Sequence, residues 1–256
     1  VAVYAGDTLS TVSRVLGVKQ NRDGQTGVVY VHSVGRNQHG DLVLEYVRWV
    51  MVRKRDPASP APEAVVPELP ESVAPSAMTA PVHLATHAVH TELSGSPHLF
   101  EDYAVGERIE HVDAMTIEES DHMMAARLFQ NTARVHFNQH VEREGRFGRR
   151  IVYGGHIISL ARALSFNGLA NIVGMAAIHG GRHVSPTFAG DTIYAWTEVL
   201  AVDPLPGRID VGVLRLRTVA LKDRSAADFP YRQADGAYDP AVVLDFDYSV
   251  LMPRRS

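Results

Sequence analysis

Residues 130–161 read QNTARVHFNQHVEREGRFGRRIVYGGHIISLA and join a candidate reactive loop to the start of an apolar helix. Asn131 and His136 stand five residues apart, and two adjacent glycines, Gly154 and Gly155, follow a basic loop. A histidine can activate water and an amide can orient it. The first N–H groups of a helix lack partners within the helix, and glycine lets a ligand approach the backbone closely. The stretch therefore predicts a site for a reaction at a carbonyl group.

The segment that follows predicts a buried helix and an antiparallel sheet. Residues 155–169 are apolar nearly all round, which is typical of a buried helix, and Gly168 is a suitable stop signal. A Thr-x-x-Glu pattern at 116–119 fits a capping box and predicts a helix from there to about residue 129. Alternation of apolar and polar residues predicts strands at 107–112, 176–185, 190–202, 208–221 and 242–252.

The two ends of the chain carry the same pattern. YAGDTL at 4–9 matches FAGDTI at 188–193, and LVLEY at 42–46 matches VVLDF at 242–246, which indicates a repeated unit. About 90 residues of the second copy precede its Gly-Asp turn, but only five precede Gly6 in the first. We therefore expect the first copy to lack its opening strand and central helix, as a fragment of a longer polypeptide would. The alternative is a naturally short protein whose strands pair with another subunit.

Composition excludes several classes of function. The chain has 256 residues, 45% of them hydrophobic, and its formal net charge of -4 gives no basis for non-specific binding of nucleic acid, which needs a basic face. It contains no cysteine, which excludes disulfides, zinc-thiolate sites and a cysteine nucleophile. It shows no signal peptide and no uninterrupted apolar run of about 20 residues. A soluble cytoplasmic protein without a membrane partner is the expectation.

The loop and the glycines resemble the MaoC-like (R)-specific enoyl-CoA hydratases, whose hot-dog fold carries an Asp, a His five residues later, and a glycine at the start of its central helix. Here those positions hold Asn131, His136 and Gly154. The stretches RLFQNTARVHFNQHVEREGRFGRRIVYGGHIISLARALSFNGLAN, AGDTLSTVS and VVLDFDYSVLMPRR extend the resemblance to a double hot-dog branch of hydro-lyases, over essentially the whole chain. The resemblance implies an α+β double hot-dog fold, in which an antiparallel sheet wraps a long central helix.

The resemblance also implies a division of the chain. Residues 1–56 would form the C-terminal part of the first hot dog, 57–97 a linker and polar loop, and 98–256 the second, MaoC-like hot dog. Seven of the fourteen prolines fall between residues 56 and 82, which predicts an extended, semi-rigid connection. The histidines that follow it could form a metal tract, but no carboxylates or cysteines complete a ligand set, so a solvated loop is favoured. They are His83, His87 and His90.

The implied reaction is the reversible addition of water to a 2-methyl-branched, dicarboxylic enoyl-CoA, without a cofactor, in a homo-oligomer of two or more subunits. His136 would activate water, and the N–H groups of Gly154 and Gly155 would polarise the thioester carbonyl. Substrate would be held by further side chains near the site, although any one arginine among them could be an ordinary surface residue. The candidates are Arg134, then Arg127, for the free carboxylate, Arg146, Arg149 and Arg150 for the CoA phosphates, and Gln130 and Tyr153.

Asn131 departs from the wider family. An Asp there can accept a proton, whereas an amide can only orient water or a carbonyl. Either His136 is the sole base, or a carboxylate from elsewhere completes the site. Glu118, Glu119 and Asp121 lie in a first helical turn, where carboxylates usually interact with the helix dipole. A zinc site using His136 and His140 is excluded, because Phe137 stands where that motif needs its Glu.

Three other functions stay open at this point. Loss of the Asp favours a non-catalytic acyl-CoA or acyl-carrier binding module, while the retained His136 and both glycines disfavour it. A thioesterase would need a carboxylate on the central helix, where the sequence offers only Ser159 and Ser165. An (R)-enoyl-CoA hydratase for another acyl-CoA is the third.

Overall fold

A computed structural model describes residues 1–86 and 89–255 of the chain. His87 lies outside the described residues, so the solvated loop predicted around His83, His87 and His90 is described only in part. The chain divides into two compact units, Val1–Pro70 and Glu71–Ser256. The predicted domain boundaries at residues 56 and 97 stay a prediction.

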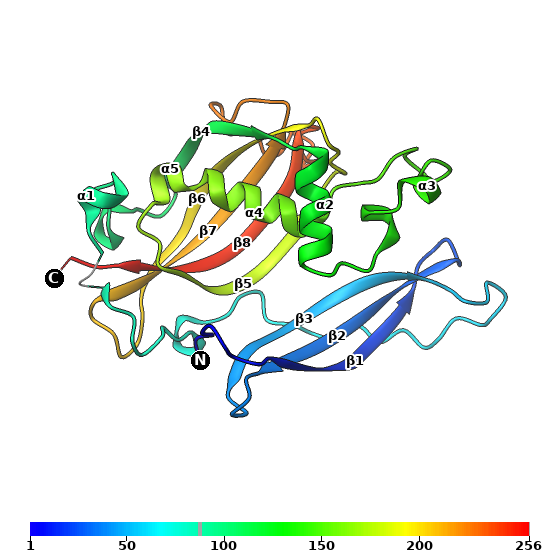
Figure 1. The fold of residues 1–256 in the computed structure, drawn as a ribbon, viewed down its shortest axis with the longest axis horizontal. Helices are drawn as coiled ribbons and strands as arrows, with labels where there is room; N and C mark the ends of the chain where they lie inside the picture. The colour runs from blue at the N-terminus through cyan, green and yellow to red at the C-terminus, as the bar shows by residue number, and fades with distance from the viewer. Residues whose placement is uncertain (87–88, 256) are drawn as a thin grey trace. The chain divides into compact units, whose positions relative to one another are not determined.

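The first unit is an antiparallel sheet with the strand order β1-β2-β3 (Figure 1). Residues 1–70, all of which the structure describes, contain no helix. Asp23 holds the turn between the first two strands by accepting hydrogen bonds from the N–H groups of Gln25 and Thr26, each at 2.9 Å. The strands are β1 Ser10–Gln20, β2 Thr26–Arg36 and β3 Leu42–Arg53.

The second unit is an antiparallel sheet with the strand order β4-β6-β7-β8-β5. Its strands are β4 Arg108–Thr116, β5 Gly174–His183, β6 Thr192–Pro204, β7 Val211–Lys222 and β8 Val242–Pro253. Its α-helices are α1 Thr91–Ser94, α2 Glu119–Leu128, α3 Gln139–Glu142, α4 Gly154–Leu164 and α5 Phe166–Leu169. Short 3-10 turns span Pro75–Ala77, Phe100–Asp102 and Arg134–His136.

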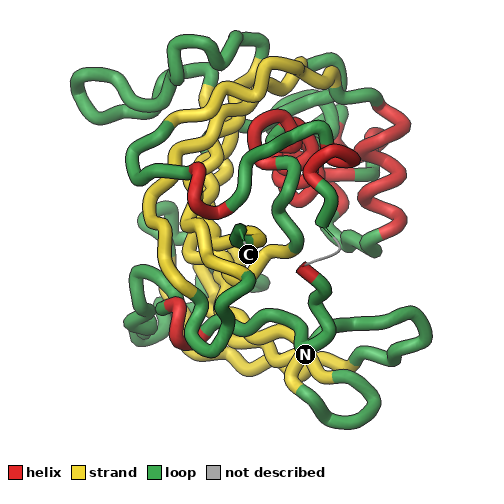
Figure 2. Tube along the Cα trace, turned by 90° about the vertical axis from the view of Figure 1, so that its left-hand side faces the viewer, coloured by secondary structure: helices red, strands yellow, loops and turns green. Residues whose placement is uncertain are grey.

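Helix α4 is the centre of the main core. Figure 1 shows it lying against one face of the five-stranded sheet, and Figure 2 shows the helices gathered on one side of the strands. Its buried residues belong to the same apolar cluster as side chains from the middle strands of the sheet. Burial of apolar surface is the main favourable term in folding, so this contact explains why an almost wholly apolar segment forms a helix here. The helix residues are Ile157, Leu160, Ala161 and Leu164, and the strand residues include Val199, Leu216, Phe246 and Val250. The predicted hot-dog arrangement is confirmed.

The repeat predicted from the sequence is present in the structure. Asp7 accepts a hydrogen bond from the N–H of Tyr4 at 2.8 Å, and Asp191 accepts one from the N–H of Phe188 at 2.9 Å. The glycine between each pair has nearly the same positive φ, 96° at Gly6 and 94° at Gly190. Identical turns thus open β1 and β6.

The two sheets also share their irregularities. The pairing of β1 with β2 shifts between Val15 and Gly17, and that of β6 with β7 shifts between Val199 and Ala201. Each shift lies at the same distance from its Gly-Asp turn. A bulge is a specific feature of a strand, so a shared position supports two copies of one unit.

The predicted capping box at 116–119 is wrong. Thr116 is the last residue of β4, and its hydroxyl lies 2.9 Å from that of Thr192 on the neighbouring strand. Helix α2 begins three residues later, at Glu119, and its N-cap residue Glu118 makes no side-chain cap. Pairing with β6 therefore overrides the local capping pattern.

The central helix is shorter than predicted. Helix α4 ends at Leu164. The backbone leaves helical geometry at Asn167 and at Gly168, and φ of Gly168 is 104°. A Cβ at position 168 would lie 2.5 Å from the side chain of Ile109, so only glycine fits this kink. The kink turns the Asn167 carbonyl toward Nδ1 of His111, 2.7 Å away, and a buried polar group gains a partner.

Among the residues that the structure describes, no helix is long and apolar enough to cross a membrane.

Candidate active site

The loop that carries Asn131 and His136 begins at the end of α2. Gln130 has φ 49°, and the N–H of Asn131 donates to the carbonyl of Ala126 at 2.8 Å, which is a left-handed helix termination. The side-chain oxygen of Asn131 then accepts a hydrogen bond from the N–H of Ala133 at 2.9 Å. The carbonyl end of this amide therefore shapes the loop, and no hydrogen bond joins Asn131 to His136 among the described residues.

His136 ends the 3-10 turn Arg134–His136 and is half-buried. Its Nδ1 lies 3.1 Å from the carbonyl oxygen of Ile151, and the N–H of Ile151 donates to the carbonyl of Val135 at 3.1 Å. A carbonyl oxygen can only accept, so Nδ1 carries the proton of the neutral imidazole. Nε2 is left with a lone pair and can take a proton from water.

The two glycines at the start of α4 each lie under a neighbouring side chain. A Cβ at position 154 would lie 2.5 Å from Nε2 of His183, the last residue of β5. A Cβ at position 155 would lie 2.6 Å from the ring of Tyr153. Tyr153 in turn packs edge-on against His136, with 5.8 Å between the ring centroids. The structure therefore brings His136, Tyr153 and both glycines together.

The first N–H groups of α4 are available to a ligand. The carbonyl of Tyr153 accepts from the N–H of His156 at 2.9 Å, but no described residue accepts a hydrogen bond from the N–H of Gly154 or Gly155. The N-terminus of a helix also carries a partial positive charge. An oxygen that becomes negative during a reaction is stabilised at such a place.

The arginines predicted to bind substrate have different surroundings. Arg150 binds Glu119 on α2 as an ion pair and also contacts the sulfur of Met123. Arg149 is exposed, and its guanidinium lies 3.8 Å from the ring centroid of Phe188. Arg134 and Gln130 are exposed on the loop itself. Their predicted roles in substrate binding stay predictions.

Two histidines on the neighbouring helices, His122, which is buried, and His156, which is half-buried, were missed by the sequence reasoning. His122 on α2 is 1% exposed, and its Nε2 lies 3.2 Å from the carboxylate of Glu119. Burial lowers the pKa of His122, and the charge of Arg150 also lowers it. The carboxylate of Glu119 has the opposite effect and raises it. His156 on α4 also has its pKa lowered by burial, while Asp121 raises it.

These contacts change the interpretation of the first turn of α2. Glu119 is not simply a solvated partner of the helix dipole, because its carboxylate binds both Arg150 and His122. The pair of Glu119 and His122 three residues apart on a helix was a usable signal in the sequence, since such residues face the same side.

His183 is the third histidine that was missed, and it is the one that touches the glycine corner. Partial desolvation of its ring lowers its pKa, and a positive charge on His136 lowers it further. No local pattern links His183 to Gly154, because the sheet alone brings β5 to the start of α4.

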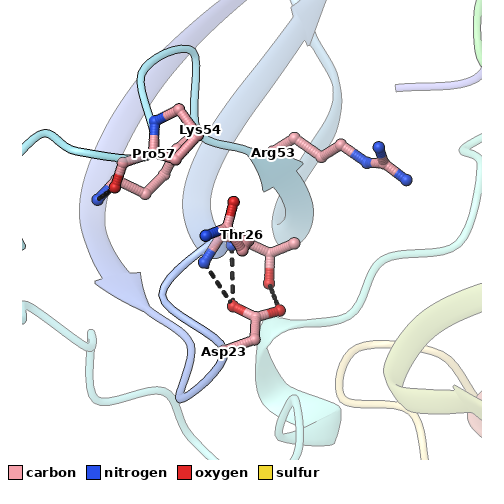
Figure 3. A pocket seen from close by; sticks show the side chains of 6 residues that line it. Asp23, Thr26, Arg53, Lys54 and Pro57 are labelled. Atoms are coloured by element: carbon pink, nitrogen blue, oxygen red, sulfur yellow. Dashed lines mark hydrogen bonds between the residues drawn. The ribbon is translucent and has the colours of Figure 1, made fainter.

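The described residues contain no group of three or more side chains suited to hold a metal ion. The first unit has a surface pocket of about 450 Å³, and two of its charged side chains, Asp23 and Lys54, are engaged in the fold of that unit (Figure 3). Asp23 holds the β1–β2 turn, and Lys54 donates to the carbonyl of Ser59 at 2.5 Å and to Gln20 at 3.1 Å. The pocket is lined by Asp23, Gln25, Thr26, Arg53, Lys54 and Pro57.

Comparison with known proteins gives consistent relatives. Residues 101–218 match the family described as MaoC like domain. The chain is 68% identical over 253 residues to the beta-methylmalyl-CoA dehydratase of Chloroflexus aurantiacus, an alignment that covers 99% of the chain and 72% of that protein. It is 54% identical over 254 residues to the mesaconyl-CoA hydratase of Cereibacter sphaeroides, covering 98% of the chain and 72% of that protein.

Solved structures agree with this assignment. A MaoC domain dehydratase from Chloroflexus aurantiacus superposes with a TM-score of 0.95 at 68% identity, over 99% of this chain and 72% of that one. A protein from Mycobacterium tuberculosis with a double hotdog fold superposes with a TM-score of 0.64 at 27% identity, over 96% of this chain and 70% of that one.

Proposed function

This chain belongs to the MaoC-like dehydratase family, and on that premise we propose that it is a hydro-lyase that adds water reversibly to mesaconyl-CoA to give β-methylmalyl-CoA. The two relatives named for these compounds support the choice of substrate. The single structural observation that carries the proposal is the arrangement of His136. Its Nε2 is the free nitrogen, and its ring packs against that of Tyr153, which lies beside Gly155 at the start of α4.

The chemistry follows from this arrangement. Nε2 of His136 takes a proton from water as the water oxygen forms a bond to the β carbon of the enoyl thioester. The electron pair of the double bond moves toward the thioester carbonyl, whose oxygen becomes negative and accepts hydrogen bonds from the N–H groups of Gly154 and Gly155. The protonated His136 then returns the proton to the α carbon, so the atoms of one water molecule are added and His136 is regenerated.

Asn131 supports the base without exchanging protons. An amide neither gives nor takes a proton at neutral pH, and its oxygen accepts from the N–H of Ala133 in the loop that leads to His136. In this proposal, His136 is the sole base, and Asn131 holds the loop in place.

The remaining candidates bind the substrate. Arg134 and Gln130 lie exposed on the loop and are the groups we assign to the free carboxylate of the acyl chain. Arg149 is assigned to the CoA phosphates because its guanidinium is not held in an ion pair among the described residues. Arg150 can bind the CoA phosphates only while it also forms its ion pair with Glu119.

We propose further that the protein uses no cofactor, since a histidine and two backbone N–H groups suffice for the proton transfers. We also propose that the protein forms a homo-oligomer of two or more subunits in the cytoplasm. It does not bind nucleic acid or membranes. The net charge of -4 supports the expectation that the protein does not bind nucleic acid.

One assay separates the proposed function from its alternatives. Purified protein is mixed with mesaconyl-CoA, and loss of the conjugated enoyl absorbance is followed beside release of free CoA thiol. Hydration without CoA release is expected. Release of CoA would indicate a thioesterase, binding without either change a non-catalytic module, and turnover of crotonyl-CoA alone a hydratase for another acyl-CoA.

A further inference from the structure

We propose that His183 is a catalytic residue of this site, whose Nε2–H donates a hydrogen bond to the thioester oxygen beside the N–H of Gly154. The proposal rests on the proposed function and deepens it. It adds a side-chain donor from β5 to the two backbone donors of α4.

The position of His183 is fixed by the sheet. It is the last residue of β5 and pairs with Leu244 of β8. From there its ring reaches the first residue of α4. A Cβ at position 154 would lie 2.5 Å from Nε2, 2.7 Å from Cε1 and 3.0 Å from Cδ2 of His183. The Nε2 edge of the ring therefore faces the glycine at which the thioester oxygen binds.

His183 is also available to a ligand, unlike the other histidines of the sheet. The residue is exposed, and no described residue forms a hydrogen bond with either ring nitrogen. His179, four residues earlier on β5, accepts from the N–H of Val73 at 2.9 Å and pairs with Ser249 at 2.8 Å. His111 on β4 likewise uses both nitrogens, with Asn167 and Thr197. These two histidines hold the fold together, whereas His183 has no such partner.

The charge state of His183 suits a donor that keeps its proton. Partial desolvation of its ring lowers its pKa, and the positive charge that His136 acquires when it takes a proton lowers it further. At neutral pH the ring is therefore neutral and carries one N–H. With that hydrogen on Nε2, His183 stabilises the negative oxygen of the intermediate and takes no part in the proton balance, which His136 completes alone.

The test compares three variants with the parent enzyme. His183→Leu removes the donor, His183→Gln keeps an N–H donor on a side chain of similar reach, and His179→Gln alters the same strand away from the site. Hydration of mesaconyl-CoA is measured from pH 6 to 9. The unreactive saturated analogue 2-methylsuccinyl-CoA, labelled with carbon-13 in its thioester carbonyl, serves as an infrared probe of the bound carbonyl.

Removal of one oxyanion donor typically lowers kcat by about a hundred- to a thousand-fold. We expect that loss in His183→Leu with KM changed less than about threefold, because the interaction strengthens in the transition state. The carbonyl band of the bound analogue should move toward its frequency in water for His183→Leu, and only part of the way for His183→Gln. His179→Gln should keep both kcat and the band.

Several results would overturn the inference. One is a kcat in His183→Leu within about twofold of the parent, and another is an unchanged carbonyl band in that variant. A falling limb of the parent pH profile that disappears in His183→Gln would make His183 a proton donor instead. If the proposed function itself fails, the parent does not hydrate mesaconyl-CoA at all, and the infrared band alone then decides whether His183 contacts the thioester.

Discussion

Nδ1 of His136 lies 3.1 Å from the carbonyl oxygen of Ile151, and this contact selects the ring nitrogen that can act as a base. Because the carbonyl accepts the Nδ1 hydrogen, Nε2 carries the lone pair. Ile151 stands three residues before Gly154, so the same short segment holds the base and opens the helix whose N–H groups receive the thioester.

Asn131→Asp should move the pH dependence of hydration. Asp can accept the hydrogen bond from the N–H of Ala133 as Asn does, so the loop should persist. A carboxylate near an imidazole favours the protonated form, and a protonated His136 cannot act as a base. The rising limb of the pH-rate profile should therefore shift to higher pH, with lower activity at pH 7.

Asn131→Ala is the control for this change. It removes the loop hydrogen bond without adding charge, so stability should fall by about 1 kcal/mol while the rising limb stays where it is. If the rising limb of the pH-rate profile moves equally in Asn131→Asp and Asn131→Ala, or in neither, a remote carboxylate already sets the protonation of His136.

Gly154→Ala should impair catalysis more than folding. The added methyl group would lie 2.5 Å from the ring of His183 and would displace it. In a helix Ala is favoured over Gly by about 0.5–1 kcal/mol, which offsets the local strain. We expect kcat to fall about tenfold or more and the unfolding free energy to change by less than about 1 kcal/mol.

Gly174→Ala on β5 is its matched control, because a Cβ there would meet only Leu251 at an ordinary 3.9 Å. Kinetics and denaturant unfolding of the two variants would be compared. Equal activity in both would show that the position of the His183 ring is irrelevant to turnover.

His111 should make the fold weaker as the pH falls. Burial lowers its pKa from 6.5 to about 4, although the Asn167 carbonyl raises it. Between these values the unfolded chain binds a proton that the folded chain does not, so stability decreases with falling pH. The contribution between pH 7 and pH 5 is about 2 kcal/mol. Urea unfolding at both pH values measures it, and His111→Gln should lose most of this dependence even if it is less stable throughout. An equal slope in parent and variant would assign the effect to other groups.

Substitution of Arg149 should affect substrate binding, and substitution of Arg150 should affect the stability of the fold. Arg149→Gln is expected to raise KM for the CoA thioester several-fold and to weaken its salt dependence, with stability unchanged. Arg150→Gln breaks the ion pair with Glu119, which should cost up to about 1 kcal/mol of stability. Titration with CoA at two salt concentrations and thermal unfolding would distinguish the two. A larger KM effect in Arg150→Gln would reverse the assignment of the phosphate contact.

Local patterns predicted the repeating parts of this fold. The Gly-Asp turns at residues 6 and 190 and the strands β6, β7 and β8 were predicted from neighbours in the sequence, and the structure contains both. The predicted cap at Thr116 failed because pairing with Thr192, far away in the chain, determines where β4 ends. The kink at Gly168 depends in the same way on Ile109, a residue of β4.

Only part of the site could be predicted, because local sequence patterns reveal only the residues that lie close together in the chain. His136 and the two glycines lie in one stretch and could be found by their spacing. His183 reaches Gly154 only through the register of β5 with β8, which a single sequence does not reveal. The role of Asn131 in its own loop also required coordinates, since its oxygen could as well have faced His136.

The central claim is that His136 is the base of a mesaconyl-CoA hydratase reaction, and the most direct measurement is kcat/KM of His136→Ala with mesaconyl-CoA. A general base typically contributes about a hundred- to ten-thousand-fold, so a loss of that size is expected in a variant with parental circular dichroism and thermal unfolding. A kcat/KM within about twofold of the parent would contradict the account.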